Sequence, residues 1–478
     1  MSSRRRRPPR LPDRATSDHP AVQAQLDRLA TLSPGADTLG LERIAALLAR
    51  LGNPERDLPP VLHVAGTNGK GSTCAFLRAA IEAAGLTAHA YTSPHLVRFN
   101  ERIRLAGRLI ADAPLAALLA ETLDAADGME VSFFEATTAA AFLAFARTPA
   151  DACIVEVGLG GRLDATNVIE APLVCGIASL GIDHREFLLS PDPALREMPD
   201  IARIALEKAG IAKSGVPLVT MSYEPDASDA VADQADWAGA PLFASGPAWR
   251  IKPCGVNEMA YVDDRSYAGR QERLVLPRPA LVGRHQIDNA GLAIAMLRHQ
   301  DRLVVPEEAI AKGMGSARWP ARLQRLLPGP LTGKRTVWLD GGHNVSAGYE
   351  IYGYFYGPEQ SRPSMQTLRS IEKLALSDPN AAAKLFGIEF MHLIIGMLAN
   401  KDPMAIVKPL SPFLASLTAV PIPGHKHHPP AAFGAQARGA ADVAEALAAL
   451  PGDDLPVLVA GSLYLAGEAL KANDQLPD

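Results

Sequence analysis

Residues 61–73 constrain the fold of this chain more than any other segment of its sequence. They spell Val-Leu-His-Val-Ala-Gly-Thr-Asn-Gly-Lys-Gly-Ser-Thr, an apolar strand pattern that runs directly into a glycine-rich loop. Glycines let the backbone turn tightly with its amides pointing inward, and a helix opening at Ser72 and Thr73 directs its positive end at the same hollow. Lys70 adds a point charge. The segment therefore predicts a phosphate-binding loop between a buried strand and a helix.

This loop departs from the standard phosphate-loop pattern G-x-x-x-x-G-K-[ST]. Val64 stands where the first glycine is expected, and Gly71 separates Lys70 from Ser72. The plain alternative is a strand-to-helix turn whose glycines only permit close packing. The loop alone does not decide between these interpretations, so the rest of the chain has to.

Length and composition limit the class of protein. At 478 residues the chain is too long for one ordinary hydrophobic core, so we expect two domains. A hydrophobic content of 48% and a charged content of 21% are typical of a soluble globular protein, and no apolar run reaches membrane-spanning length. A formal net charge of −5 gives no reason to expect nucleic acid as a partner. We expect a monomer that binds neither nucleic acid nor membrane.

The cysteines and the N-terminus bear on the cellular compartment. Cys74, Cys153, Cys175 and Cys254 are widely spaced with no C-x-x-C pair, which favours reduced thiols in a cytosolic protein. Residues 1–19 contain a run of arginines among prolines with no apolar stretch after it. They predict a disordered basic tail rather than a secretory signal, and hence a cytoplasmic protein.

Strand and helix patterns alternate along most of the chain. Expected strands lie near 61–65, 87–91, 152–157 and 173–179, and later near 335–339, 391–396 and 456–460. Expected helices cover most of 20–52, the segment from the glycine loop to about residue 84, and 133–147. This alternation predicts an α/β fold with a mainly parallel, P-loop ATPase-type N-terminal domain and a smaller Rossmann-like C-terminal domain.

The pattern changes near residue 302, which suggests the domain junction. We assign 20–302 to the nucleotide-binding domain, 303–317 to a linker and 318–478 to the C-terminal domain. Residues 349–390 are harder to interpret, because tyrosines crowd there and prolines at 358 and 363 interrupt any helix.

Polar side chains follow several of the expected strands, where ligands bind in parallel sheets. Ser93 follows one strand and Glu156 ends another; each could hold Mg²⁺, but their plain alternatives are a turn serine and a salt-bridged glutamate. His184 follows a third strand and could equally cap a helix or lie in the core. Lys208 lies in a helical pattern, and its spacing alone favours a solvated lysine.

A second glycine-rich loop spans residues 158–167 and lacks the G-x-G-x-x-G dinucleotide frame. It carries Arg162 and Asp164, which suit a polar substrate better than a pyrophosphate. In the second domain, Arg322 could reach phosphate and Asp340 could reach ribose, because a bidentate arginine matches phosphate and a carboxylate matches hydroxyls.

Together these motifs resemble the Mur-ligase superfamily and, within it, the bifunctional dihydrofolate synthase/folylpolyglutamate synthase family. The matching pieces occur in the family's order over most of residues 40–345. They are Gly66–Ser72, Thr92–Arg104, Phe134–Thr137, Glu156–Asn167, Asp183-His184, Glu207–Ile211, His285–Ala290 and Asp340–Asn344.

The resemblance implies an ATP-dependent amide-forming ligase. A substrate carboxylate attacks the γ-phosphate of ATP to form an acyl phosphate, and the amine of L-glutamate then displaces phosphate. The other substrate is dihydropteroate or a folate. Two Mg²⁺ ions are implied as cofactors.

The resemblance also implies roles for individual residues. Lys70 neutralises charge on the phosphates, and Ser93 and Glu156 are ligands of one Mg²⁺. A second Mg²⁺ is held by His184 and by Lys208, the latter as a carbamate. The implied nucleotide contacts are Thr67, Asn68, Gly69, Lys70, Gly71, Ser72, Asn289, Arg322, Asp340 and His343. The implied contacts with the pterin-containing substrate are Ser132, Phe133, Arg162 and Asp164.

The C-terminal domain departs from the family pattern. The usual Asp-x-Ala-His-Asn-Pro becomes Asp340-Gly-Gly-His-Asn-Val345, and the helix expected after it is replaced by the tyrosine- and proline-rich stretch. Residues 400–402 are Asn-Lys-Asp where Asp-Lys-Asp is usual. These departures affect the expected glutamate contacts more than ATP binding.

Two alternatives stay open from the sequence. Another Mur-type ligase would join an amino acid to a cell-wall precursor, although we expect no uridine-nucleotide domain at the N-terminus. A non-catalytic nucleotide-binding regulator could use the same scaffold. Intact Lys70, Glu156, His184 and Lys208 argue against a pure binder.

Overall fold

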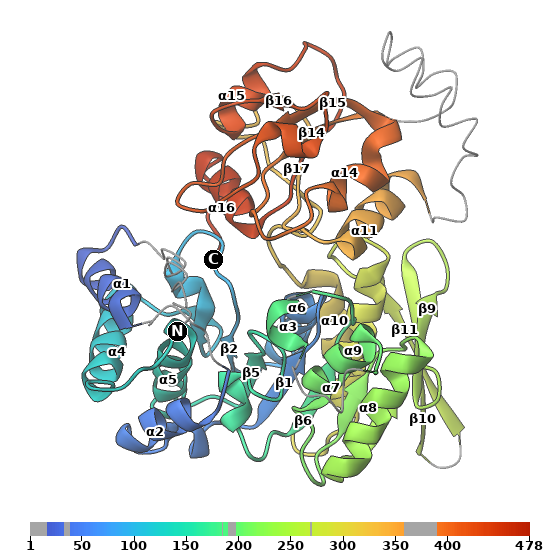
Figure 1. Ribbon diagram of the computed structural model, residues 1–478. Coiled ribbons are helices and arrows are strands. Elements are labelled where there is room, and N and C mark those ends of the chain that lie inside the picture. The colour runs from blue at the N-terminus through green and yellow to red at the C-terminus, as the bar shows by residue number, and fades with distance from the viewer. Residues whose placement is uncertain (1–16, 33–38, 184, 190–196, 268–269, 358–389) are drawn as a thin grey trace. The chain divides into compact units, whose positions relative to one another are not determined.

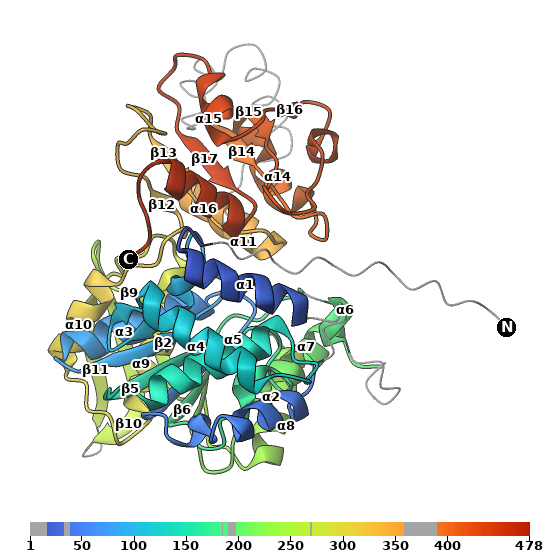
Figure 2. The same cartoon turned by 90° about the vertical axis from the view of Figure 1, so that its left-hand side faces the viewer.

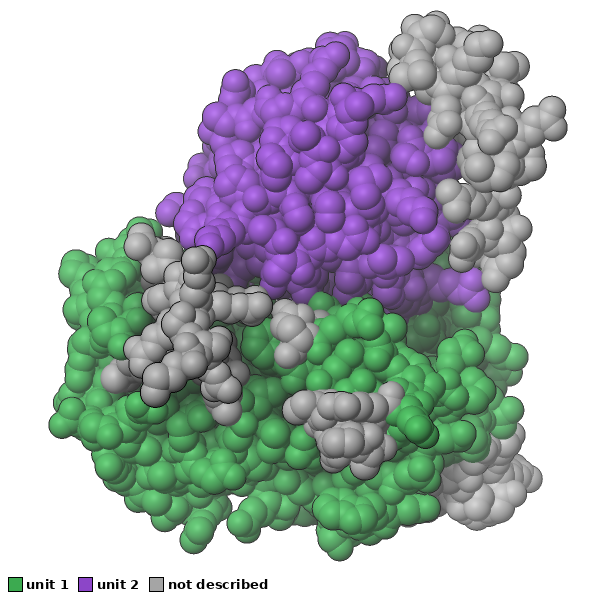
Figure 3. All heavy atoms as spheres, viewed as in Figure 1, with its two compact units in different colours: residues 1–280, 287–318 green, residues 281–286, 319–478 purple. Residues whose placement is uncertain are grey.

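The computed structural model describes residues 17–32, 39–183, 185–189, 197–267, 270–357 and 390–478 (Figure 1). The chain divides into two compact units, shown in different colours in Figure 3. Unit 1 comprises residues 1–280 and 287–318, and unit 2 comprises residues 281–286 and 319–478. The basic tail predicted over 1–19 falls mostly outside the described residues, although α1 (Pro20–Leu32) begins directly after it.

Unit 1 is built on an eight-stranded sheet with the strand order β4-β3-β2-β5-β1-β6-β7-β8. The strands are β1 (Val61–Ala65), β2 (Ala88–Tyr91), β3 (Ile103–Leu105), β4 (Arg108–Leu109), β5 (Ala152–Glu156), β6 (Val174–Ile177), β7 (Leu218–Thr220) and β8 (Leu242–Ala244). From β2 to β8 every neighbouring pair is parallel, and β3 and β4 add an antiparallel edge. β1 is central and buried along its whole length, as its uninterrupted apolar pattern predicts. The predicted strands before residue 180 are confirmed.

Helices cover this sheet. They are α1, α2 (Glu42–Arg50), α3 (Lys70–Ala83), α4 (Asp112–Ala125), α5 (Phe133–Ala146), α6 (Arg185–Leu188), α7 (Asp200–Ala209), α8 (Pro225–Ala238), α9 (His285–Arg298) and α10 (Glu307–Ser316), with 3₁₀ turns η1 (Pro54–Arg56), η2 (Phe99–Arg102) and η3 (Ala165–Val168). α1, α4 and α5 lie side by side over one face, where their leucines, alanines and phenylalanines form one core with β2 and β5 (Figure 2). α7 and α8 form a second core with β6 and β7.

The linker predicted over 303–317 is largely helical and belongs to unit 1. α10 packs against α3 so closely that a Cβ placed on Gly313 would lie 2.5 Å from the Cα of Ala80. The close approach at Gly313 and the burial of Ile310 and Met314 therefore make this segment part of the packed domain.

Unit 1 also contains a three-stranded antiparallel sheet that was not predicted from the sequence pattern. It consists of β9 (Trp249–Pro253), β10 (Glu258–Tyr267) and β11 (Arg270–Pro277). α9 packs on it at Gly291, where a Cβ would lie 2.8 Å from the Trp249 ring. Arg298 of α9 pairs with the fully buried Asp263 of β10 at 3.2 Å, so this sheet fixes the helix.

Unit 2 has a six-stranded sheet with the order β12-β13-β17-β14-β15-β16, parallel except for the β12–β13 pair. Its strands are β12 (Gln324–Arg325), β13 (Val337–Leu339), β14 (Met391–Ile395), β15 (Leu414–Ala419), β16 (Arg438–Gly439) and β17 (Val457–Ala460). Its helices are α11 (Val345–Tyr356), α14 (Met404–Leu410), α15 (Val443–Ala448) and α16 (Leu463–Ala472), with 3₁₀ turns η6 (Ser411–Phe413) and η7 (Pro430–Phe433). This confirms the smaller α/β domain predicted at the C-terminus.

The expectation that no helix follows Asn344 is wrong. α11 begins there because the Asn344 side chain accepts a hydrogen bond from the Ala347 amide at 3.0 Å. Ile351 and Tyr352 are buried at helical spacing, so the tyrosines belong to the helix, which ends before Pro358. The rest of the tyrosine- and proline-rich stretch, residues 358–389, lies outside the described residues. In the part of the chain that is described, no helix is both long and apolar enough to cross a membrane.

Candidate active site

The loop after β1 has the geometry of a phosphate cradle. Gly66 and Gly69 adopt φ of +144° and +86°, a region that side chains rarely tolerate. A Cβ on Gly66 would lie 2.9 Å from that of Ala178, and a Cβ on Gly69 would collide with the side chain of Asn289 from α9. The first hydrogen bond of α3 joins the Thr73 amide to the Gly69 carbonyl at 2.9 Å. The amides before it, from Lys70 to Ser72, therefore have no acceptor inside the helix and suit an anion.

Thr67 and Asn68 bond to the segment after β6 with their backbone amides. Both backbone amides donate to the Ser179 carbonyl, at 2.8 and 3.3 Å. The Thr67 hydroxyl donates to the Gly181 carbonyl at 2.9 Å and accepts from the Gly181 amide at 3.0 Å. These two residues tie the phosphate loop to the segment after β6, which leads to Asp183.

Lys70 and Lys208 converge on this loop. Lys70 Nζ lies 3.0 Å from the Gly66 carbonyl oxygen and 3.4 Å from that of Thr67. Lys208 Nζ, from α7, lies 3.1 Å from the same Gly66 oxygen. Only 5% of Lys208 is exposed, so the interpretation as a solvated surface lysine is wrong. Burial, and then the charge of Lys70, lower the pKa of Lys208 to about 7.

Lys208 is buried because α7 packs against the second glycine-rich loop. A Cβ on Gly161 would lie 2.7 Å from the carbonyl oxygens of both Glu207 and Lys208. The Arg162 guanidinium pairs with the Glu207 carboxylate at 2.7 Å, and the Arg162 backbone amide donates to the Glu207 backbone carbonyl, also at 2.7 Å. This loop thus fixes the helix that carries Lys208.

Glu156 and Ser93 lie together at the ends of the neighbouring strands β5 and β2. The Ser93 amide donates to Glu156 Oε2 at 3.2 Å, and only 4% of Glu156 is exposed. The negative charge of Glu156 helps to raise the pKa of Cys74 in α3, where burial is the larger cause, while Lys70 opposes it. The charges of Glu156 and Lys70 therefore both act on the Cys74 thiol beside the phosphate loop.

This pair fits a magnesium ion. A carboxylate and a hydroxyl are hard oxygen donors, and Mg²⁺ takes one or two protein ligands while water and phosphate oxygens complete its shell. No group of three or more histidine, cysteine or acidic side chains that could hold a metal occurs among the described residues, so a closed all-protein cage is not what the site offers. His184 lies outside the described residues, but its neighbour Asp183 interacts electrostatically with Lys208.

The carboxylate of Asp164, which was expected to contact the substrate, accepts hydrogen bonds from its own loop. Its Oδ1 accepts from the amide and hydroxyl of Thr166 at 3.0 and 2.6 Å, and its Oδ2 accepts from the Leu159 amide at 2.8 Å. Burial raises the pKa of this carboxyl group, and the hydrogen bonds oppose the rise. Asp164 shapes the loop, whereas half of the Arg162 side chain is exposed and can meet a ligand.

Ser132 and Phe133 begin α5. Ser132 caps the helix by accepting from the Glu135 amide at 3.2 Å, while Glu135 accepts from the Ser132 amide at 2.6 Å. The guanidinium carbon of Arg102 lies 5.6 Å from the centre of the Phe133 ring. The capping box therefore holds Phe133 at the N-terminal end of the helix, beside a buried cation.

Arg102 and His95 form a pair that was not predicted from the sequence, although both lie inside the Thr92–Arg104 motif. Arg102 is only 3% exposed and donates from Nε to His95 Nδ1 at 2.9 Å. Burial, and then the charge of Arg102, lower the pKa of His95 to about 3, so the imidazole is neutral. The motif was the only signal for this cluster, because neither residue stands out by spacing.

Unit 2 contributes three further candidates at the end of β13. Arg322 donates from Nη1 to the Ala321 carbonyl at 3.1 Å. Asp340 is 7% exposed, and its carboxylate accepts from two backbone amides. His343 Nδ1 lies 3.1 Å from the Gly341 carbonyl oxygen. The structure thus groups Arg322, Asp340 and His343 within unit 2, and Thr67–Ser72, Ser93, Glu156, Lys208 and Asn289 within unit 1.

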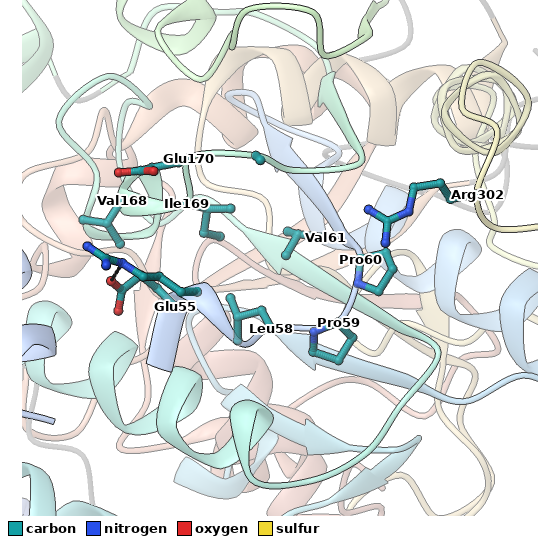
Figure 4. Close-up of a pocket in the computed structure, with 11 residues that line it drawn as sticks. Glu55, Leu58, Pro59, Pro60, Val61, Val168, Ile169, Glu170 and Arg302 are labelled. Carbon is teal, nitrogen blue, oxygen red and sulfur yellow. Dashed lines mark ion pairs between the residues drawn. The ribbon is translucent and has the colours of Figure 1, made fainter. Parts of the chain in front are cut away.

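A cavity of about 400 Å³ in unit 1 is separate from this site (Figure 4). Val61, the first residue of β1, lines it together with Pro60, Ile169 and Arg302. The phosphate loop follows the last residue of the same strand, so the cavity lies at the opposite end of β1.

Comparison with protein-family models found no match. The chain is 38% identical over 317 residues to the dihydrofolate synthase/folylpolyglutamate synthase of Bacillus subtilis, covering 64% of this chain and 69% of that protein. It is 32% identical over 449 residues to the folylpolyglutamate synthase of Lacticaseibacillus casei, covering 89% and 92%.

Solved structures resemble the chain over nearly its whole length. Escherichia coli FolC in complex with DHPP and ADP matches with a TM-score of 0.77 at 30% identity, covering 95% of this chain and 97% of that one. A bifunctional folylpolyglutamate synthase/dihydrofolate synthase with Mn, AMPPNP and L-glutamate bound matches with a TM-score of 0.74 at 29% identity, covering 94% and 97%.

Proposed function

This chain belongs to the dihydrofolate synthase/folylpolyglutamate synthase family of ATP-dependent glutamate ligases, and we propose that it forms its amide bond through an acyl phosphate. The observation that best supports the proposal is the convergence of Lys70 and the buried Lys208 on the Gly66 carbonyl. A turn that served only packing would not need two lysine side chains at one backbone oxygen. Phosphoryl transfer needs positive charge, which Lys70 would supply directly and a carbamylated Lys208 would supply through a bound metal ion.

The proposed reaction has two steps. First, a carboxylate oxygen of dihydropteroate or of a folate attacks the γ-phosphorus of ATP, and the bond from that phosphorus to the bridging oxygen breaks to release ADP. Second, the amino nitrogen of L-glutamate attacks the activated carbonyl carbon, the carbon–oxygen bond to phosphate breaks, and the nitrogen loses a proton. Lys70 and the amides from Lys70 to Ser72 would hold the phosphates and stabilise charge as it moves to ADP.

We infer that the divalent metal is Mg²⁺ and that Ser93 and Glu156 hold one ion. When bound, the ion would neutralise charge on the phosphate oxygens. A second ion would be held by His184 and a carbamylated Lys208. Carbamylation joins the neutral amine nitrogen to the carbon of CO₂ and releases one proton, so an amine with a pKa of about 7 is suited to it.

The remaining candidates divide between the nucleotide and the pterin-containing substrate. We propose Asn289, Arg322, Asp340 and His343 for the nucleotide side, and Ser132, Phe133 and Arg162 for the substrate side. Asp164 would act on the substrate indirectly, because its carboxylate is engaged within its own loop. We also propose that the protein is a cytoplasmic monomer; its four cysteines are all free thiols.

Product analysis tests this proposal directly. Purified protein would be incubated with ATP, Mg²⁺ and L-glutamate, adding dihydropteroate or tetrahydrofolate in turn, and ADP and glutamylated products would be measured by mass spectrometry. Product from dihydropteroate alone would show that the enzyme adds the first glutamate. Product from tetrahydrofolate alone would show that it adds later ones, and product from both would show that it does both. Turnover only with a uridine-linked cell-wall precursor would identify another Mur-type ligase. ATP binding without ADP formation under any of these conditions would identify a regulator.

A further inference from the structure

We propose that Tyr223 is a positioning residue, whose hydroxyl fixes residues 178–181 and, through them, the phosphate loop. Tyr223 stands outside every motif that carries the family resemblance, so this inference goes beyond the proposed function. It rests on that function only in taking residues 66–72 as the loop that holds ATP.

The phosphate loop rests on the segment that follows β6. The Thr67 amide donates to the Ser179 carbonyl at 2.8 Å, and the Thr67 hydroxyl is hydrogen-bonded to both backbone groups of Gly181. Gly66 approaches the same segment so closely that a Cβ there would lie 2.9 Å from that of Ala178. A shift of this segment would therefore move the phosphate loop with it.

The chain turns out of the sheet at Ala178, directly after β6. The Ala178 amide donates to the Ala65 carbonyl of β1 at 2.8 Å, whereas the Ala178 carbonyl accepts from the Tyr223 hydroxyl at 3.0 Å. Tyr223 follows β7, which is the neighbour of β6 on the side away from β1. In a regular strand both backbone groups of one residue point to the same neighbouring strand, so the ladder no longer holds the chain here.

The Tyr223 hydroxyl bonds to the chain at the point where the ladder stops. The last pair of the β6–β7 ladder joins Ile177 to Thr220. The hydroxyl lies 2.6 Å from the Ile177 carbonyl oxygen as well as 3.0 Å from that of Ala178. A phenol has one proton, so two successive carbonyls share it. The Met221 amide is a longer second donor to Ile177, at 3.3 Å.

Both of these carbonyls need a partner inside the protein. Ile177 and Ala178 are completely buried, and a buried carbonyl without a donor is costly. Burial raises the pKa of the Tyr223 phenol well above its usual range, so the hydroxyl keeps its proton and stays a donor throughout the working pH range.

Removing the hydroxyl while keeping the ring should release the segment without opening the core. In Tyr223→Phe the ring can still pack against the core that α7 and α8 form with β6 and β7. The Ala178 carbonyl, however, loses its hydroxyl donor. The segment should then relax, and the phosphate loop should no longer be held in one position.

Steady-state kinetics of Tyr223→Phe test this role. We expect kcat to fall by about 10-fold, within the ~100-fold that a misplacement of about 1 Å can cost, while the KM for L-glutamate stays within about 2-fold of wild type. Tyr261→Phe is the matched control, because the Tyr261 hydroxyl is also buried but donates to Asp263, at 3.1 Å, in the three-stranded sheet. This control should keep its kcat even if its Tm falls. An equal fall of kcat in both variants, or none in Tyr223→Phe, overturns the proposal.

A double-mutant cycle with Thr67→Val tests whether the two side chains act through one segment. Thr67 bonds to Gly181 and Tyr223 bonds to Ala178, so either change should release the same stretch of backbone. The loss of kcat in the double variant should therefore be smaller than the product of the two single losses. A loss equal to that product would show independent effects and would overturn the proposal.

Hydrogen–deuterium exchange of the protein without substrates keeps this proposal distinguishable from the proposed function. In Tyr223→Phe the peptides that contain Thr67, Asn68 and Gly181 should exchange faster than in wild type, because their amides bond across this segment and loop. Peptides from β14 should not change. Unchanged exchange in the phosphate loop overturns the positioning role whatever the activity is. Faster exchange there, in a protein whose wild type forms no ADP, would disprove the proposed function alone.

Discussion

Lys70 and Lys208 donate to the same atom, the carbonyl oxygen of Gly66, at 3.0 and 3.1 Å. Two ammonium groups that share one acceptor repel each other, and this repulsion adds to burial in lowering the pKa of Lys208 to about 7. The phosphate loop and the helix α7 are therefore linked electrostatically, although they are far apart in the sequence.

Replacing Lys70 should abolish phosphoryl transfer without unfolding the protein. We expect Lys70→Ala to lower the rate of ADP formation by about 10²- to 10³-fold or more, because a preorganised charge on the transferring group is lost. The exposed Lys252 offers a control, since Lys252→Ala removes an equal charge from β9. Turnover near that of wild type in Lys70→Ala would contradict the nucleotide assignment. The same variant should raise the pKa of Lys208, measured from the pH dependence of its chemical labelling.

Lys208 should be needed for catalysis as a carbamate. Its neutral fraction grows as pH rises through about 7, so activity should increase over that range and with added bicarbonate. Lys208→Ala should be nearly inactive yet folded, and acetate should restore part of the rate by filling the vacated space. A ¹³C signal after incubation with labelled bicarbonate should appear in wild type and be missing in Lys208→Arg. Full activity of Lys208→Ala would end this idea.

The same lysine should affect stability in bicarbonate-free buffer. Its folded pKa lies below its unfolded value, so the unfolded chain binds more protons between about pH 7 and 10.5 and stability rises with pH there. Lys208→Met removes this penalty. Its gain in free energy of unfolding should be largest below pH 7 and shrink towards pH 10.5 in denaturant titrations. A gain that does not depend on pH would argue against a buried charged lysine.

The metal site should respond differently to its two ligands. Glu156→Gln should raise the Mg²⁺ concentration needed for half-maximal activity by at least about 10-fold, because the buried carboxylate is lost. Ser93→Ala should have a smaller effect, since the backbone amide that bonds Glu156 remains. Activity titrated with Mg²⁺ and with Mn²⁺ measures both. Equal metal requirements in Glu156→Gln and wild type would rule out this pair as ligands.

Thr67 should act by anchoring its loop rather than by binding phosphate. Its hydroxyl exchanges two hydrogen bonds with Gly181, so Thr67→Val should lower kcat while Thr67→Ser, which keeps the hydroxyl, should stay near wild type. Steady-state kinetics with varied ATP distinguishes the two. A Thr67→Val variant with an unchanged kcat would show that this anchor is dispensable.

His63 should make the protein sensitive to acid. Burial, and then the charge of Lys213, lower its pKa to about 3, and its Nε2 lies 2.9 Å from the Thr166 hydroxyl. In the unfolded chain His63 takes up a proton near pH 6.5, whereas in the folded chain it stays neutral down to about pH 3. The free energy of unfolding therefore falls as pH falls from about 6.5 towards 3, by about 1.4 kcal/mol per pH unit for this group. His63→Gln should flatten that slope in chemical denaturation at pH 4–7. An unchanged slope would contradict the buried neutral imidazole.

Local sequence pattern is sufficient to predict several parts of this protein. The apolar run 61–65 followed by glycines and Lys70 predicted β1, its phosphate loop and α3, because strand and helix periods and glycine turns are local properties. The sequence also placed Ser93 and Glu156 after neighbouring strand patterns, and the family resemblance implied that they share one Mg²⁺; in the structure the Ser93 amide donates to Glu156.

Other features depend on contacts between segments that are distant in the sequence. Helical spacing placed Lys208 at the surface, whereas packing of α7 against Gly161 buries it and brings it to Gly66. The role of Asp164 as an internal support depends on which backbone amides the fold brings within reach, and the sequence shows only that a carboxylate stands at this position. Burial and hydrogen-bond partners come from contacts between distant segments, and one-dimensional periodicity carries no information about those.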